Sequence, residues 1–456
     1  MVKVITYGTY DLLHYGHVRL LERAKALGDY LVVGVTSDDF DMSRGKINVQ
    51  QSLMERIEAV KKTGLADEII VEEYPGQKID DIIRLGIDIF TVGSDWKGKF
   101  DYLNEFCRVV YLDRTEGVSS TELRTKNRAL RLGMYGDETL FEFEKYKTES
   151  QYVNGAELVG ICKENTDKES NLQNNDTSGA DKKIYDSYEE LLEDCDAVYI
   201  ETNPENRYDQ VKKALEKGKH VLCKMPVTLS KRETMELIDA AKKKNLVLMG
   251  AIKTAYSVAY NRLILLAKSG HIGKVVHADV TCTRIDDDTI DNTKMPNEWN
   301  GLCTWGPFAM LPVFQLMGID YEEVDIKTYP FREKKGIDAF TKIDFTYKDK
   351  TATIKVGKGV KAESEMIISG TQGYIYVPAP WWKTDYFEIR YERLENKKKY
   401  FYQLDGEGIR FEIAAFIKSI QTGRTGNYIN NSIMEHISKI VESYYKGEGV
   451  KYMDPI

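Results

Sequence analysis

Two histidines, His14 and His17, stand three positions apart in the segment "GTYDLLHYGH" (residues 8–17), in a chain that has only six histidines. The segment follows the apolar run "VKVITYG" and leads into the amphipathic "HVRLLERAKALG", so it joins a predicted strand to a predicted helix. The first turn of a helix offers unpaired N–H groups and a partial positive charge, which together bind phosphate. Two imidazoles at that place can donate hydrogen bonds to a phosphoryl group as its charge grows in a transition state. The spacing therefore predicts phosphoryl-transfer chemistry.

The glycines of this segment argue against an alternative interpretation, in which the two histidines are ordinary polar residues at a helix end with no ligand. Gly8 would let the backbone approach a phosphate closely, and Gly16 would keep the start of the helix uncrowded. A polar helix end requires neither glycine, nor does it require a position directly after a strand. The segment is therefore interpreted as a phosphate site.

The elements that must position this segment alternate between strands and helices over the first 125 residues or so. Apolar runs rich in β-branched residues predict strands at 3–8, 30–37, 68–73, 89–95 and 108–114. Amphipathic periodicity predicts helices at 17–28, 50–64 and 78–86. Such alternation is typical of a doubly wound parallel sheet, which binds its ligands at the carboxyl ends of the strands. The two histidines follow the first of these ends.

Composition restricts the class of protein. The 456 residues predict two or three domains, and 42% apolar with 30% charged residues is typical of a globular protein. A net charge of −8 gives no basic footprint for nucleic acid or for an anionic membrane. The six cysteines stand as singletons, which predicts reduced thiols, and no apolar run approaches the roughly 18 residues of a membrane span. We therefore expect a cytoplasmic protein.

A second α/β pattern begins near residue 129 and gives way to a different pattern near 271. Strands are predicted at 157–164, 196–202, 220–226 and 245–251, with a helix at 208–218 and a solvated polar loop at 165–183. Beyond 273, alternating segments such as "KVVHADVTCTR" and "TATIKVGKG" predict an open antiparallel sheet, and two helices end the chain. The predicted class is α/β, with a doubly wound, Rossmann-like domain (1–128), a second Rossmann-like domain (129–270) and an α+β open-sheet domain (271–456).

Three blocks of the first domain carry a family resemblance. The segment from Thr6 to Phe40, together with "GSDWKGKFDYL" and "RTEGVSSTELR", resembles the glycerol-3-phosphate cytidylyltransferases of the HxGH nucleotidyltransferase superfamily. The resemblance covers residues 1 to about 126, with the blocks in the family order. It implies a transferase that joins CTP to a phosphorylated polyol and releases diphosphate.

The resemblance also implies roles for individual residues. His14, His17, Arg114 and Lys46 would be catalytic, and Arg44 and Lys78 would bind the phosphate of the acceptor. Without the resemblance, each of these cations would be interpreted as a solvated surface charge. The residues implied to contact CTP are Gly8, Thr9, Tyr10, His14, His17, Lys46, Asp95, Arg114, Thr115, Gly117, Ser119, Ser120 and Thr121.

The implied chemistry requires no covalent nucleophile, because the acceptor's phosphate oxygen is already an anion. Catalysis would consist of in-line positioning and charge stabilisation, with Mg²⁺ accompanying the triphosphate. Asp11 could assist this metal or orient a neighbouring group. Asp95 could contact the nucleotide, and it could equally be a turn residue.

The rest of the chain resembles the Gfo/Idh/MocA oxidoreductases, which bind NAD(P) and act on sugars and polyols. The resemblance rests on "DAVYIETNPENRYDQVKKALEKGKHVLCKMP", "SGHIGKVVHADVTCTR" and "IISGTQGYIYVPAPWW". It implies a glycine-rich phosphate loop where this chain has "GDETLF", which begins at Gly136 and places two carboxylates near a pyrophosphate.

Other functional positions of that family are also replaced. Lys163 stands where an acid usually binds the ribose, although a lysine there could also indicate a preference for a 2′-phosphate. The family's Glu-Lys-Pro is "CKMP", with Lys224 and Met225, and its later acid and proton donor become Thr304 and Phe308. Neither Met225 nor Phe308 can transfer a proton. NAD(P) is therefore expected to bind weakly or not at all.

Three hypotheses follow for the whole chain. The first is a CTP-dependent transferase whose second half is structural or binds a ligand without redox chemistry. The second is a bifunctional enzyme whose second half supplies or modifies the polyol phosphate with NAD(P). The third, a non-catalytic assembly protein, is disfavoured by the intact histidine and "RTEGVSST" blocks. Homodimers are expected, with no nucleic-acid or membrane partner, and the acceptor is left open between glycerol 3-phosphate and another polyol phosphate.

Overall fold

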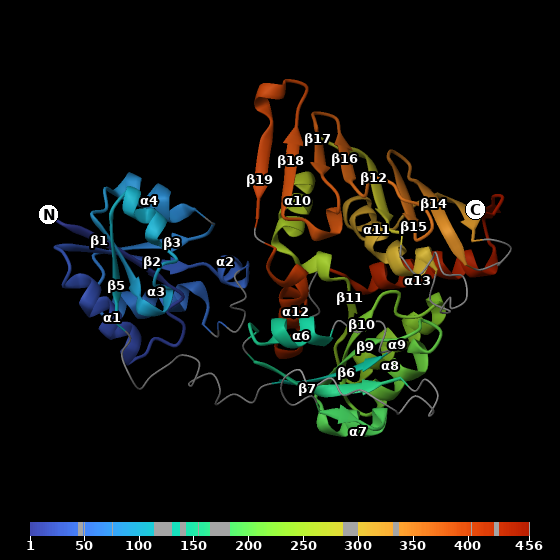
Figure 1. Ribbon diagram of the computed structural model, residues 1–456, viewed down its shortest axis with the longest axis horizontal. Coiled ribbons are helices and arrows are strands. Elements are labelled where there is room, and N and C mark those ends of the chain that lie inside the picture. The colour runs from blue at the N-terminus through green and yellow to red at the C-terminus, as the bar shows by residue number, and fades with distance from the viewer. Residues whose placement is uncertain are drawn as a thin grey trace. The chain divides into compact units, whose positions relative to one another are not determined.

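The computed structural model describes residues 1–43, 49, 51–74, 76–113, 130–136, 143–153, 155–164, 183–285, 300–331, 337–402, 404–423 and 428–455. The chain divides into two compact units (Figure 1). The first comprises Met1–Ala129 with Tyr152–Gly155, and the second comprises Leu130–Gln151 with Ala156–Ile456.

A parallel sheet of five strands, in the order β3-β2-β1-β4-β5, forms the centre of the first unit. The strands are β1 (Lys3–Gly8), β2 (Tyr30–Thr36), β3 (Glu68–Glu72), β4 (Ile89–Gly93) and β5 (Arg108–Leu112). The helices are α1 (Tyr15–Lys25), α2 (Asp38–Ser43), α3 (Leu53–Lys62) and α4 (Gln77–Leu85), with 3-10 turns η1 (Ser94–Trp96) and η2 (Asp101–Glu105). The chain reverses its direction of winding between β1 and β4, so the predicted doubly wound sheet is confirmed.

Alternation along the central strands explains their almost continuous apolar sequence. Val4 faces a core shared with Leu21 of α1, whereas its neighbour Ile5 faces a second core shared with Ile82 of α4. Because both faces of a parallel sheet are covered by helices, both sets of side chains must be apolar.

A second parallel sheet, of six strands in the order β11-β10-β9-β6-β7-β8, begins the second unit. The strands are β6 (Leu130–Gly136), β7 (Ala156–Lys163), β8 (Ile184–Tyr185), β9 (Ala197–Glu201), β10 (His220–Lys224) and β11 (Leu248–Ala251). The helices are α6 (Phe143–Ser150), α7 (Tyr188–Asp194), α8 (Arg207–Glu216) and α9 (Lys231–Lys243). This arrangement confirms the Rossmann-like prediction.

A nine-stranded sheet follows, in the order β19-β18-β17-β16-β12-β15-β14-β13-β20. Its strands are β12 (Val275–Thr283), β13 (Glu323–Pro330), β14 (Asp338–Thr346), β15 (Thr351–Gly357), β16 (Met366–Gly370), β17 (Tyr374–Val377), β18 (Tyr386–Arg390), β19 (Lys398–Phe401) and β20 (Val450–Tyr452). The accompanying helices are α10 (Val258–Lys268), α11 (Gly301–Met317), α12 (Ile409–Thr422) and α13 (Asn431–Lys446), with 3-10 turns η3 (Lys253–Tyr256), η5 (Trp381–Lys383), η6 (Leu394–Asn396) and η7 (Asp405–Gly408).

The predicted open sheet is confirmed, but it is mixed rather than antiparallel throughout, because two of its strand pairs are parallel. β12 pairs in parallel with β15, and β13 pairs in parallel with β20. In the chain, α11 and the hairpin of β13 and β14 separate β12 from β15, and a long connection of this kind permits parallel pairing. Periodicity within a strand does not reveal which strand becomes its neighbour.

The apolar helix α11 packs against β12, β14 and β15, and a buried carboxylate holds its first turn. Asp338 accepts hydrogen bonds from the backbone of Leu302, at 3.1 Å, and from the hydroxyl of Thr341, at 2.8 Å. Burial raises the pKa of Asp338 to about 6, although these donors oppose the rise. Within the described part of the chain, no helix combines the length and apolar character that a membrane span requires.

All six cysteines are free thiols, and five of them are buried. Burial raises the pKa of Cys162, Cys195 and Cys223 to about 11, which keeps these thiols protonated and unreactive at neutral pH. They act as small core residues.

Candidate nucleotide site

The segment with the two histidines lies at the point where the strand order of the first sheet reverses. Residues 9–13 connect the carboxyl end of β1 to the start of α1, and η1 follows the carboxyl end of the neighbouring strand β4. A doubly wound sheet binds ligands in the crevice at this reversal. Asp95 lies in η1 and is exposed.

The backbone at the start of α1 orients both imidazoles. The N–H of Gly16 donates to Nδ1 of His14 at 3.0 Å, and the N–H of His14 points at Nδ1 of His17 at 3.5 Å. The two rings stack with their centroids 3.9 Å apart. Because Nδ1 of each ring acts as an acceptor, the neutral imidazole carries its proton on Nε2. Both histidines therefore carry an Nε2–H group at the N-terminus of one helix.

The surroundings of these donors favour an anion. The first turn of α1 contains no acidic residue, so the partial positive charge of the helix end is not cancelled there. Gly8 ends β1 directly beneath the ring of Tyr10, and a Cβ on Gly8 would lie 3.0 Å from Cζ of that ring. A side chain at position 8 would displace Tyr10, whose ring lies 5.6 Å from that of His17.

Among the residues that the structure describes, Asp11 is part of no metal-binding cluster. Its carboxylate is buried and accepts the N–H of Gln51 at 3.0 Å. The described residues contain no group of three His, Cys, Asp or Glu side chains that could hold a metal ion. Mg²⁺ is often bound mainly by substrate phosphates with one or two carboxylates, and Asp11 is compatible with that arrangement.

Lys78 lies near the N-terminus of α4 and is almost completely buried. Its Nζ forms an ion pair with Glu72, the last residue of β3, and lies 4.6 Å above the ring of Tyr7. Glu72 also accepts the hydroxyl of Thr36 at 2.9 Å. Lys78 is thus held among strand ends, rather than on the solvated surface that the alternative interpretation would require.

Eight of the predicted site residues lie outside the described residues, so the structure does not place them. They are Arg44, Lys46, Arg114, Thr115, Gly117, Ser119, Ser120 and Thr121.

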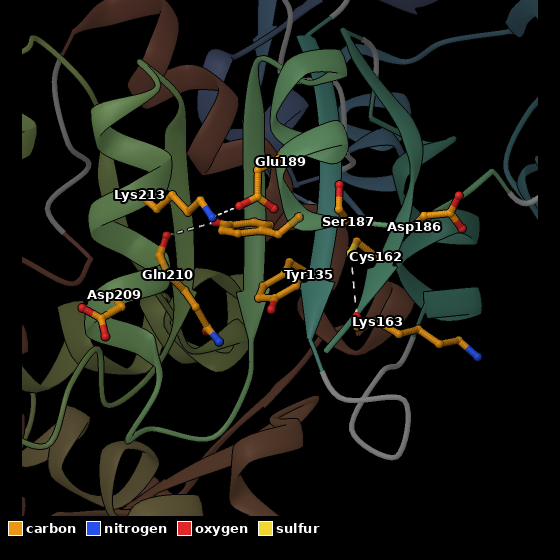
Figure 2. Close-up of a pocket in the computed structure, with 10 residues that line it drawn as sticks. Tyr135, Cys162, Lys163, Asp186, Ser187, Glu189, Asp209, Gln210 and Lys213 are labelled. Atoms are coloured by element: carbon orange, nitrogen blue, oxygen red, sulfur yellow. Dashed lines mark hydrogen bonds and ion pairs between the residues drawn. The ribbon is translucent and has the colours of Figure 1, made fainter. Parts of the chain in front are cut away.

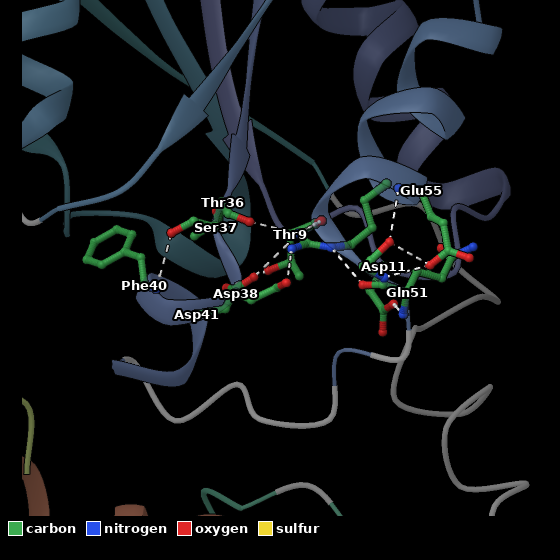
Figure 3. Close-up of polar contacts among 11 residues, drawn as sticks. Thr9, Asp11, Thr36, Ser37, Asp38, Phe40, Asp41, Gln51 and Glu55 are labelled. Carbon is green, nitrogen blue, oxygen red and sulfur yellow. Dashed lines mark hydrogen bonds and ion pairs between the residues drawn. The ribbon is translucent and has the colours of Figure 1, made fainter. Parts of the chain in front are cut away.

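Three further residues of this site were missed by reasoning from the sequence. Arg56, Asp41 and Gln51 contact the segment between Thr9 and Leu12 through side-chain and backbone hydrogen bonds (Figure 3). One signal was available for Arg56, because it lies four residues before the buried Val60 on the apolar face of α3. A charge on such a face indicates a buried partner.

In the second unit, the carboxyl edge of the parallel sheet carries a buried ion pair where a dinucleotide fold binds phosphates. Gly136 ends β6 and pairs with Glu201, the last residue of β9. Glu201 is buried and forms an ion pair with Lys224 at the end of β10. Met225 is buried against Gly250, whereas Thr304 and Phe308 lie on α11.

An open pocket of about 300 Å³ lies beyond the carboxyl end of β7 (Figure 2). Lys163 contributes to its wall, and the stacked rings of Tyr135 and Tyr188 have their centroids 4.0 Å apart. Lys213 on the opposite wall pairs with Glu189. The complete lining is Tyr135, Cys162, Lys163, Asp186, Ser187, Tyr188, Glu189, Asp209, Gln210 and Lys213.

Comparison with known proteins supports a dehydrogenase-like fold for the second unit. Residues 133–251 match the family model "Oxidoreductase family, NAD-binding Rossmann fold". A scyllo-inositol 2-dehydrogenase (NADP(+)) from Bacillus subtilis is 28% identical over 282 residues, which cover 59% of this chain and 82% of that protein. A 3-ketoreductase from Actinomadura kijaniata has a similar structure, with a TM-score of 0.60 at 16% identity, covering 72% of this chain and 99% of the other. The second unit therefore resembles Gfo/Idh/MocA oxidoreductases.

The first unit has much closer relatives. Residues 5–126 match the family model "Cytidylyltransferase-like". Glycerol-3-phosphate cytidylyltransferase from Bacillus spizizenii is 51% identical over 124 residues, which cover 27% of this chain and 95% of that enzyme. The enzyme of the same name from Staphylococcus aureus is 44% identical over 128 residues, covering 27% and 93%. Through its first unit, with paired imidazoles at a helix N-terminus, this chain belongs to the cytidylyltransferase-like family and is a nucleotidyltransferase.

Proposed function

We propose that the protein transfers the cytidylyl group of CTP to sn-glycerol 3-phosphate, or to a closely related polyol phosphate, and forms CDP-glycerol and diphosphate. The observation that carries the proposal is the pair of imidazoles of His14 and His17 at the N-terminus of α1, whose Nδ1 atoms accept backbone N–H groups. The named activity of relatives at 44% to 51% identity supports the choice of nucleotide and acceptor.

In the proposed reaction, a phosphate oxygen of the acceptor attacks the α-phosphorus of CTP in line. One P–O bond forms to the acceptor, and the bond between the α-phosphorus and the bridging oxygen breaks, so that its electron pair leaves with diphosphate. His14 and His17 donate to the phosphoryl oxygens as their charge increases. When bound, Mg²⁺ would supply charge neutralisation for the triphosphate.

The remaining residues would orient the two substrates. Gly8, Thr9, Tyr10 and Asp95 would contact the nucleotide, and Lys78 would bind the acceptor's phosphate. From outside the described residues, Lys46, Arg114 and the hydroxyls of "RTEGVSST" would bind CTP, and Arg44 would assist Lys78. A guanidinium at position 44 would favour bidentate binding of phosphate.

A substrate screen tests the nucleotide and the acceptor together. Diphosphate release by the full-length enzyme with Mg²⁺ should be fastest with CTP and glycerol 3-phosphate, compared with ATP and with a panel of phosphorylated polyols. A second polyol phosphate that exceeds glycerol 3-phosphate in kcat/KM would correct the acceptor alone. Preference for ATP over CTP would contradict the cytidylyl assignment.

We further propose that the second unit carries out no hydride transfer. In the sequence, Asp137 and Glu138 directly follow Gly136, where the pyrophosphate of a dinucleotide would have to approach. Like charges at this place oppose binding of the cofactor. Met225, Thr304 and Phe308 also leave the positions of the proton relay without a titratable side chain.

The alternative, an active NAD(P)-dependent second unit, is favoured by one observation, the position of Lys163 in the pocket beyond β7. Our proposal predicts the opposite of this alternative. Polyols and polyol phosphates incubated with the full-length enzyme and NAD⁺ or NADP⁺ should give no change in absorbance at 340 nm. Titration with NADH or NADPH should give no saturable change in nicotinamide fluorescence at cofactor concentrations up to about 100 times a typical micromolar Kd. Saturable binding would contradict the electrostatic argument, and turnover would establish the bifunctional alternative.

The division of labour within the chain follows from these proposals. We assign catalysis to a domain formed by residues 1–128. The dehydrogenase-like unit would consist of a Rossmann-like domain (129–270) and an open-sheet domain (271–456). We also propose a homodimer, which light scattering of the purified chain would test.

A further inference from the structure

The segment that carries the catalytic histidines has an unfavourable backbone. Tyr10 has a φ of 54° and Leu12 a φ of 46°, both in the left-handed region that large side chains avoid. A large side chain held in this region strains the backbone, so the conformation persists only where the surroundings hold it. The contacts that hold Tyr10 and Leu12 therefore bear on catalysis.

On the N-terminal side of Tyr10, Thr9 is held by two buried residues. The Thr9 hydroxyl donates to Oδ1 of Asp41 at 2.8 Å, and its carbonyl accepts from Nη1 of Arg56 at 2.7 Å. Arg56 is fully buried and also donates to the carbonyl of Thr36 at 2.8 Å. The guanidinium thus ties the end of β1 to the end of β2.

On the C-terminal side of Tyr10, Gln51 contacts two further residues, and Figure 3 shows its contact with Asp11. Its Oε1 accepts the N–H of Leu12 at 2.8 Å, and its own N–H donates to Oδ1 of Asp11 at 3.0 Å. The carbonyl of Gln51 accepts from Nε of Arg56 at 3.2 Å. The contacts on both sides of Tyr10 therefore meet at one guanidinium.

Between these two anchors, the ring of Tyr10 is 2% exposed and lies edge-on to His17, with the ring centroids 5.6 Å apart. We propose that Arg56, Asp41 and Gln51 form a clamp that holds Tyr10 in its left-handed conformation and so positions His17 for phosphoryl transfer. They are positioning residues, because they act through Tyr10 and the backbone rather than on the substrates. This inference rests on the proposed transferase function.

Four variants separate positioning from folding. Gln51→Leu removes the oxygen that accepts the N–H of Leu12. Thr9→Val keeps the shape of the side chain at position 9 but removes the hydroxyl that donates to Asp41. Thr9→Ser retains that hydroxyl. Ser52→Ala is the matched control, because Ser52 caps α3 through Glu55 and has no hydrogen bond to the segment, yet its loss destabilises the same region.

We expect Gln51→Leu and Thr9→Val to lower kcat about tenfold, with KM for CTP changed by less than about threefold. Ser52→Ala should remain within about twofold of the wild-type kcat, and Thr9→Ser, which keeps the hydroxyl, should lose less kcat than Thr9→Val. Melting temperatures of Thr9→Val and Ser52→Ala should be similar, so stability alone cannot account for the difference. If Gln51→Leu fails to fold, the kcat of Thr9→Val compared with that of Thr9→Ser tests the clamp.

Equal kcat values for Thr9→Val, Thr9→Ser and Ser52→Ala would overturn the clamp. So would losses confined to KM, because they would place these residues in substrate binding. Failure of the proposed function is a distinct result, since the wild-type protein would then release no diphosphate from CTP.

Discussion

His17→Ala is expected to lower kcat by about 10²–10³, the usual cost of removing one donor to a transition-state oxyanion. KM for CTP should change much less, because the donor is most useful when charge builds on the phosphoryl oxygens. His14→Ala should behave alike, since its ring stacks on that of His17 at the same helix end. Steady-state diphosphate release, normalised to folded enzyme by circular dichroism, measures both.

Amide replacements test which ring nitrogen is the donor. The amide nitrogen of a glutamine can reach the place of Nε2, whereas that of an asparagine reaches only the place of Nδ1. His17→Gln should therefore retain more activity than His17→Asn, which should resemble His17→Ala. His277→Ala, in the second unit, is the control and should leave kcat unchanged. A higher kcat for the asparagine variant would contradict the tautomer deduced from the structure, and a near-normal kcat for His17→Ala would make both histidines ordinary helix-end residues.

Replacing Lys78 should raise KM for the acceptor by about tenfold or more, because a dianionic phosphate would lose a charged donor. KM for CTP should rise far less. The single variant Lys78→Met also removes the ion pair that Lys78 forms with the buried carboxylate of Glu72, which should destabilise the first unit by about 3 kcal/mol or more.

The double variant Lys78→Met with Glu72→Gln separates these two effects. It removes the buried charge, so stability in urea should recover while KM for the acceptor stays high. Lys61→Met, at an exposed position of α3, should change neither. Recovery of the acceptor's KM in the double variant would mean that Lys78 only neutralises Glu72, and equal increases for both substrates would remove its assignment to the acceptor.

The sequence by itself determined the class of fold, the location of the histidines and the chemistry of the first unit. Period-2 and period-3.6 patterns are local, and strands that are apolar on both faces indicate a parallel sheet covered by helices. A helix that starts directly after a strand must place its first turn at the carboxyl edge of the sheet. The position of His14 and His17 followed from that alone.

Only the tertiary structure decided what depends on neighbours distant in the chain. The sequence could not show that β12 pairs in parallel with β15, because register and partner are set by packing of the whole sheet. Nor could it show that Lys78 is buried against Glu72, or that Glu201 lies beside Gly136. The clamp around Tyr10 is the sharpest case, because Thr9, Asp41, Gln51 and Arg56 span 47 positions and meet only once β1, β2 and α3 are packed. Burial gives such contacts their energy, and burial is a property of the assembled fold.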